Sequence, residues 1–114
     1  MVTNLEDRRR FPRSTLREPI RFQVKGFPQY SNAVTENISI GGLGFLADRF
    51  IAPSTQVIME ISVLSHILRP IGKISWSSPL PHSDRNRLGV EFMEMVPEEK
   101  GYLSDYLDMK MGKF

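Results

Sequence analysis

The sequence predicts a mainly β protein: a six-stranded antiparallel β-barrel with a flexible basic N-terminal arm and a C-terminal α-helix. Three observations support this fold class. Six short segments alternate between apolar and polar residues, as strands do, and turn residues separate them. The last segment changes to the spacing of a helix. Basic side chains gather at the start of the chain, where no period is sustained.

The arm comprises residues 1–17 and is expected to be mobile until a ligand binds it. Six of the ten arginines lie within residues 8–21. Residues 1–21 hold six basic and three acidic side chains, whereas the other 93 residues hold nine basic and ten acidic ones. The formal net charge of +2 therefore conceals a cationic arm on a nearly neutral body.

The barrel is expected over residues 18–95. Its strands are predicted at about 19–25, 30–38, 43–46, 56–64, 71–76 and 88–93, with a polar loop over 79–86. In the second strand, simple alternation places Thr35 and Asn37 on one face of the sheet and Ile38 on the other. In the fourth, Val57 and Met59 share a face with the apolar residues that follow at the same spacing.

The helix is expected over residues 97–111. Pro97 suits the first helical position, and the two glutamates that follow it suit the positive end of the helix dipole. Leu103, Tyr106 and Leu107 have the spacing of one apolar stripe, which can dock on the barrel. Gly112 can end the helix.

Composition and motifs exclude several classes of protein. At 114 residues the chain is interpreted as a single domain, residues 1–114. It contains no cysteine, and its two histidines lack metal-ligand spacing, so no metal is expected. No apolar segment is long enough to cross a bilayer and no secretory signal is recognisable, which indicates a cytoplasmic protein. A Walker loop, a dinucleotide fingerprint and a nucleophile elbow are all missing, so an enzyme is disfavoured.

The arginines of the arm suit an anionic ligand. Guanidinium forms bidentate hydrogen bonds with phosphate and with the O6/N7 edge of guanine, and it stacks on aromatic planes. Because Pro12 disfavours a helical conformation at Phe11, the arm is expected to be extended or turned rather than helical. Taken alone, the arm is better explained by a general basic tail for nucleic acid or acidic lipid, or by a solvated terminus.

A second polar segment follows the second predicted strand. Asn37 offers hydrogen-bond donors and an acceptor, and Ser39 adds a hydroxyl two residues later. Gly41 and Gly42 permit positive φ and the close approach of a backbone or a ligand, and consecutive amides there can bind an anion. The alternative is an Asx turn and a bulge that merely end a strand.

Together, Arg9-x-x-x-Arg13 and Asn37-x-Ser39-x-x-Gly42 resemble the two-part signature of PilZ domains, which are bacterial receptors for cyclic di-GMP. The similarity extends to the segments GGLGF (41–45), GKISW (72–76) and LGVEF (88–92). It covers nearly the whole chain, from about residue 8 to 106, and implies a six-stranded barrel with a C-terminal helix.

The resemblance also implies a binding site. It assigns Arg9, Arg13, Asn37, Ser39 and Gly42 to cyclic di-GMP. Asparagine at position 37 stands where many members have aspartate, which is within the family pattern. In the same way, an arginine at position 8 implies a stacked pair of ligand molecules rather than one. For the tryptophan at position 76, a contact with the ligand and a place in the core or on the barrel surface remain equally open.

These interpretations predict a sensor that binds cyclic di-GMP and signals to an effector protein that the sequence does not identify. Two alternatives come from other classes of protein. One is a small β-barrel that binds single-stranded nucleic acid, which the concentration of charge at one terminus disfavours. The other is an adaptor that keeps the barrel and binds no ligand.

Overall fold

The computed structural model describes residues 16–112. In chain order, its elements are β1 (Pro19–Val24), β2 (Ser31–Ile38), β3 (Gly42–Ala47), β4 (Gln56–Val63), β5 (His66–Leu68), β6 (Ile71–Pro79), β7 (Asn86–Glu94) and α1 (Pro97–Lys110). All strand pairs are antiparallel.

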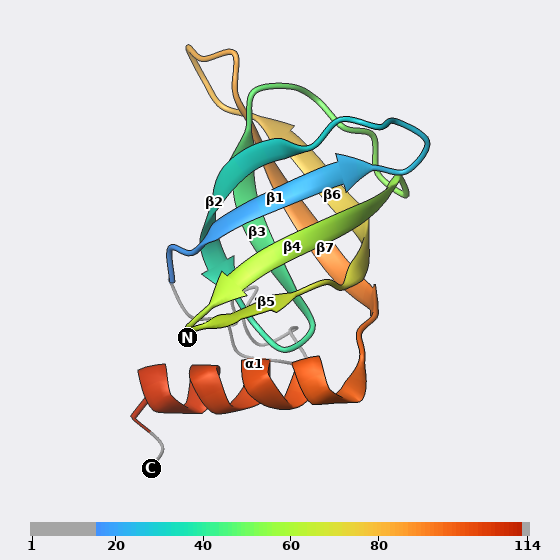
Figure 1. Ribbon diagram of the computed structural model, residues 1–114. Coiled ribbons are helices and arrows are strands. Elements are labelled where there is room, and N and C mark those ends of the chain that lie inside the picture. Colours follow the sequence, from blue (N-terminus) through green and yellow to red (C-terminus); the bar gives the residue numbers. More distant parts are fainter. Residues whose placement is uncertain (1–15, 113–114) are drawn as a thin grey trace.

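The sheet closes on itself. Six strands are neighbours in the order β1-β2-β3-β7-β6-β4, and β4 pairs with β1 to complete the ring (Figure 1). Closure leaves no edge strand in the ring with unpaired backbone groups. The predicted six-stranded antiparallel barrel with a C-terminal helix is therefore confirmed. The additional short strand β5 pairs with the end of β4. Its three residues are too few for alternation to reveal it.

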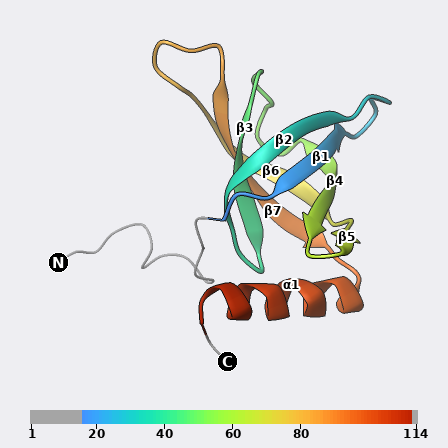
Figure 2. The ribbon, with the colours of Figure 1, turned by 60° about the vertical axis from the view of Figure 1, so that its left-hand side comes forward.

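The inner faces of the strands form one apolar core. The inward residues of β4 are fully buried, as their alternation predicts: Val57, Met59, Ile61 and Val63. The helix α1 lies across one end of the barrel (Figures 1 and 2). Its stripe of Leu103, Tyr106 and Leu107 is buried, so the predicted docking face is confirmed. Within residues 16–112, no helix has the length and apolar character needed to cross a bilayer.

Strand β2 contains a β-bulge that the sequence pattern does not reveal. Thr35 pairs with Phe45, but Asn37 pairs with the next residue of β3, Gly44, so Glu36 is an extra residue in the ladder. Thr35 is fully buried, whereas Asn37 is only partly buried. The prediction that these two side chains share a face is wrong, because an extra residue reverses the alternation beyond it.

The segment that enters β1 is fixed at two points. The Thr35 hydroxyl donates to the Leu16 carbonyl over 2.6 Å and accepts from the Glu18 N–H over 2.9 Å. On the other side, the Tyr106 hydroxyl of α1 donates to the Glu18 carboxylate. Burial raises the pKa of Glu18 above its ordinary value of 4.5, and the positive charge of Lys110 lowers it in part. Strand β2 and helix α1 therefore both hold the point where the arm meets the barrel.

Truncation of the helix stripe should weaken the fold. We expect Leu103→Ala to lower the free energy of unfolding by about 2–5 kcal/mol, because it leaves a cavity between α1 and the barrel. The control is Leu64→Ala, where the same atoms are removed from a side chain that is 67% exposed. That change should stay within about 0.5 kcal/mol. Chemical denaturation measures both, and equal losses would contradict the assigned core.

Stability should depend on the ionisation of Glu18. Its pKa is raised in the folded protein, so the folded state holds this proton more tightly than the unfolded chain does. The contribution of the protonated form is therefore present at low pH and lost as the pH rises from about 4.5 through the folded-state pKa. We expect Glu18→Gln to flatten this part of the stability profile, measured by denaturation from pH 4 to about 7. An unchanged slope would contradict the assignment.

Candidate functional site

Four strands bring one row of residues together on the outer face of the barrel. Neighbouring pairs in the sheet align Asn37 of β2, Gly44 of β3, Gly89 of β7 and Trp76 of β6. We call these four residues the glycine row. Its two central positions have no side chain, and its two outer positions supply an amide and an indole. The row thus combines a hydrogen-bonding group with an aromatic surface.

Both outer side chains lean over the glycines. A Cβ added to Gly44 would lie 3.1 Å from the Asn37 Oδ1 and 3.2 Å from its Nδ2. A Cβ on Gly89 would lie only 2.2 Å from the Trp76 Nε1 and 2.5 Å from its Cε2. The amide and the indole therefore occupy the space that larger residues would fill. Glycine is needed at position 89, where the indole is packed over the Cα, and it gives the Asn37 amide room at position 44.

A second bulge places Trp76 in this row. Ile74 pairs with Val90, and Trp76 pairs with the adjacent residue Gly89, so Ser75 is an extra residue in β6. Ile74 is fully buried, whereas Trp76 is 40% exposed. Without the extra residue, alternation would turn the indole toward the core. The structure therefore places Trp76 on the barrel surface rather than in the core, while its contact with a ligand stays a prediction.

The Ser39 side chain stabilises the turn between β2 and β3. Its Oγ accepts hydrogen bonds from the N–H groups of Gly41 and Gly42, each over 3.2 Å, and donates to the Gly42 carbonyl over 3.2 Å. The Ser39 N–H also donates to that carbonyl over 2.8 Å. Ser39 is 3% exposed. The two amides expected to form an anion-binding nest thus surround a hydroxyl, and the direct ligand contact assigned to Ser39 remains a prediction.

Gly42 is required by the packing of β3 against β7. Its Cβ would lie 2.0 Å from the Val90 carbonyl oxygen, a backbone atom that cannot move aside easily. Among the described residues, the glycines with positive φ are Gly26 and Gly112. Gly41 and Gly42 are not among them, so the turn does not use the left-handed conformation that the sequence suggested. The close approach of another backbone is the physical reason for glycine at position 42.

An ion pair lies beside the glycine row. Arg87 is two residues before Gly89 on β7, on the same outer face, and it reaches across to Glu36 of β2. Its Nε donates to Oε1 over 2.8 Å and its Nη2 donates to Oε2 over 3.2 Å. The hydrogen bond to Glu36, and then the carboxylate charge, raise the pKa of Arg87 further above its ordinary value.

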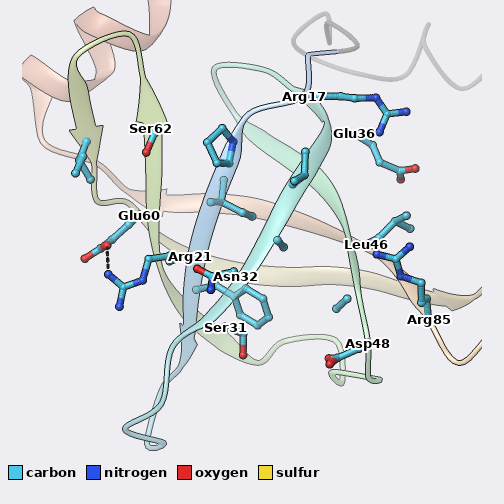
Figure 3. Close-up of a pocket in the computed structure, with 17 residues that line it drawn as sticks. Arg17, Arg21, Ser31, Asn32, Glu36, Leu46, Asp48, Glu60, Ser62 and Arg85 are labelled. Atoms are coloured by element: carbon cyan, nitrogen blue, oxygen red, sulfur yellow. Dashed lines mark hydrogen bonds and ion pairs between the residues drawn. The ribbon is translucent and has the colours of Figure 1, made fainter.

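An open groove of about 1090 Å³ lies over β1 and β2 (Figure 3). Figure 3 shows Arg21 bonded to Glu60 on one side of the groove and Arg17 and Glu36 on the other. None of the four predicted site residues within the described range lines it. The groove mixes carboxylates with arginines and contains no row of planar side chains. We therefore place the candidate site at the glycine row, which the groove approaches at Glu36.

The predicted site residues divide into two groups. Asn37, Ser39 and Gly42 lie together at the β2–β3 connection, and Trp76 lies in the same cross-strand row as Asn37. The predicted arginines, Arg8, Arg9 and Arg13, lie outside the described residues. Sequence reasoning missed Gly44, Gly89 and Arg87 as parts of the site. A glycine inside each strand signals close packing, but only the register shows what packs on it.

The fold and the glycine row define a small β-barrel with a candidate binding face on its outer surface. Comparison with protein families agrees: the PilZ domain model matches residues 7–108. The chain therefore belongs to the PilZ domain family. A comparison with curated proteins gave no match.

Solved structures with the same fold have low sequence identity. The Bacillus subtilis inhibitor of motility MotI/DgrA is 17% identical with a TM-score of 0.75, covering 94% of this chain and 53% of that one. Escherichia coli YcgR in complex with c-di-GMP is 14% identical with a TM-score of 0.76, and the match covers 93% of this chain and 47% of that one. This chain thus spans about half the length of each. The PilZ domain of Escherichia coli YcgR with c-di-GMP is 13% identical with a TM-score of 0.72, and the match covers 93% of this chain and 94% of that one.

Replacement of Gly89 should displace the indole. We expect Gly89→Ala to move Trp76 outward, because the new Cβ would overlap the Nε1 at 2.2 Å. Trp76 is the only tryptophan in the chain, so its fluorescence reports the change directly. Emission should shift to longer wavelength and acrylamide quenching should increase. Gly101→Ala is the control, since its Cβ would meet open space. Identical spectra for Gly89→Ala and the unmodified protein would contradict the packing described.

Proposed function

We propose that this protein is a cyclic di-GMP receptor that binds its ligand between the arginine arm and the glycine row. Family membership supports a receptor rather than an enzyme. Two structures with the same fold, both of YcgR, contain c-di-GMP. The ligand suits the chemistry of the row, because a purine can stack on the Trp76 indole and its edge can bond to the Asn37 amide.

The observation that carries this proposal is the position of Leu16, where the arm joins the barrel. Leu16 is bonded to Thr35, and Thr35 is two residues from Asn37 on the same strand. Two residues of a strand span roughly 7 Å. Arg13 is three residues before Leu16, a distance of at most roughly 11 Å along an extended chain. The Arg13 guanidinium can therefore reach the Asn37 end of the row. Arg9 lies only four residues further along the arm.

Each group has a distinct part in the proposed complex. Arg9 and Arg13 form bidentate hydrogen bonds with guanine edges and phosphates. Asn37 bonds to a base edge, and Trp76 offers a face for stacking. Ser39 and Gly42 act first by setting the shape of the turn and the spacing of β3 and β7. Arg8 precedes the first motif arginine, and we include it as a contact to a second, stacked cyclic di-GMP molecule.

Ligand binding in this proposal orders the arm up to Leu16, which Thr35 already holds, and changes the surface around the glycine row, which an effector protein then recognises. The conformational entropy that the arm loses on binding reduces the affinity for cyclic di-GMP. The result of binding is a surface that is present only in the complex. The chemical nature of the effector is left open. MotI/DgrA is by its name an inhibitor of motility, and it is about twice as long as the present chain.

Loss of a motif arginine should weaken binding. We expect Arg13→Ala to raise the Kd for cyclic di-GMP about ten-fold or more, because a bidentate guanine contact is worth about 1–3 kcal/mol. Arg13→Lys should also bind poorly, since an ammonium group cannot supply two parallel hydrogen bonds. Isothermal titration calorimetry measures the affinity and the number of ligands, and a stacked pair predicts two per chain.

Arg69→Ala provides the matched control, because this arginine lies in the connection between β5 and β6 and its side chain forms a long ion pair with Glu60, over 3.7 Å. Its Kd should be unchanged. Absence of heat with the unmodified protein would reject the receptor assignment. Retention of single-stranded oligonucleotide that excess cyclic di-GMP fails to displace would instead favour the nucleic-acid-binding alternative.

A further inference from the structure

Arg87 occupies a distinctive position at the edge of the candidate site. On β7, Leu88 and Val90 point into the core, so Arg87 and Gly89 share the outer face. Arg87 pairs in register with Leu46 of β3, which is two residues beyond Gly44. Arg87 thus lies in the cross-strand position next to the glycine row, roughly 7 Å along the strands. It is a cation that the barrel itself supplies, in contrast to the arginines of the arm.

Its guanidinium is held in a defined orientation. The Nε and one Nη2 hydrogen donate to the two oxygens of Glu36, over 2.8 and 3.2 Å. This contact uses one edge of the planar group, so the remaining three N–H bonds point away from Glu36. The Arg87 side chain is 49% exposed, whereas the Glu36 side chain is only 20% exposed. The arrangement presents a fixed, half-exposed donor edge rather than a closed ion pair.

The β2 bulge brings a residue of the glycine row onto the face that Glu36 occupies. Glu36 follows the buried Thr35, so alternation turns its carboxylate to the outer face, and the bulge turns Asn37 to that face as well. The partner of Arg87 and the Asn37 end of the glycine row are therefore neighbours. The arm joins the barrel at the same strand, because the Thr35 hydroxyl forms hydrogen bonds with the backbone of Leu16 and Glu18. A ligand enclosed by the arm and the row would have the Arg87 guanidinium along its border.

We propose that Arg87 is a further ligand-contacting arginine, which donates to a phosphate of cyclic di-GMP while Glu36 fixes its orientation. The proposal rests on the proposed function of the same site. Phosphate is the expected partner because the free edge of a guanidinium fits two phosphate oxygens. Arg87 and the glycine row would then both contact the ligand from the barrel surface.

The test is calorimetry with cyclic di-GMP on the full chain. We expect Arg87→Ala to raise the Kd about ten-fold or more, the usual effect of losing a charge-assisted hydrogen bond. The salt dependence of the Kd should also become shallower, because one charge contact to phosphate is lost. Arg87→Lys should recover only part of the affinity, since the ammonium keeps the charge without the fork.

A pair exchange separates ligand contact from a structural role. The double variant Glu36→Arg/Arg87→Glu restores an ion pair between β2 and β7 but moves the guanidinium to the other strand. Its affinity should stay as low as that of Arg87→Ala. Recovery of full affinity would overturn the proposal, because it would show that the pair acts only by joining the strands. Thermal unfolding of each variant shows that the fold is retained.

Arg21→Ala is the matched control. It breaks the other cross-strand Arg–Glu hydrogen bond described, that of Arg21 with Glu60 over 3.2 Å, between β1 and β4. Its Kd should equal that of the unmodified protein. The two proposals fail differently: no binding by the unmodified protein rejects the receptor function, whereas normal binding by Arg87→Ala rejects only the role of Arg87.

Discussion

Two extra residues determine what the outer surface of this barrel presents. Glu36 in β2 and Ser75 in β6 each interrupt the ladder with a neighbouring strand. Beyond each of them the side-chain alternation is reversed, so Asn37 and Trp76 turn outward although Thr35 and Ile74, two residues earlier, are buried. The bulges lie on either side of the same two central strands. They place the amide and the indole of the candidate site on one surface without opening the core that stabilises the fold.

Close packing between strands then limits which residues the two central strands can contain. Gly44 and Gly89 lie beneath the Asn37 amide and the Trp76 indole, and Gly42 lies against the Val90 carbonyl. A methyl group at any of these positions would collide with a neighbour or displace it. Glycine in a strand costs stability because it has no side chain to pack. Here glycine leaves room for an amide and an indole on one surface.

The junction between the arm and the barrel is connected to both the candidate site and the helix α1. Thr35 bonds to the backbone at Leu16 and Glu18, and Tyr106 of α1 bonds to the Glu18 side chain. Strand β2 thus connects the arm to the glycine row, and Glu18 connects it to the end of the barrel that α1 covers (Figure 2). Glu18 thus forms hydrogen bonds with two elements that are far apart in the sequence, β2 through its N–H and α1 through its carboxylate.

The sequence by itself determined the fold class, six of the seven strands, the helix and its buried stripe, because local alternation and spacing specify which side chains a core can bury. It also determined the family and two of the four residues of the glycine row, Asn37 and Trp76, together with Ser39 and Gly42 of the β2–β3 connection. The tertiary structure alone decided that Asn37 and Trp76 turn to the outer face and that Ser39 forms hydrogen bonds within the β2–β3 turn. It also decided that Arg87 lies next to Glu36. These features depend on register and bulges, and register arises from pairing between distant strands rather than from any local pattern.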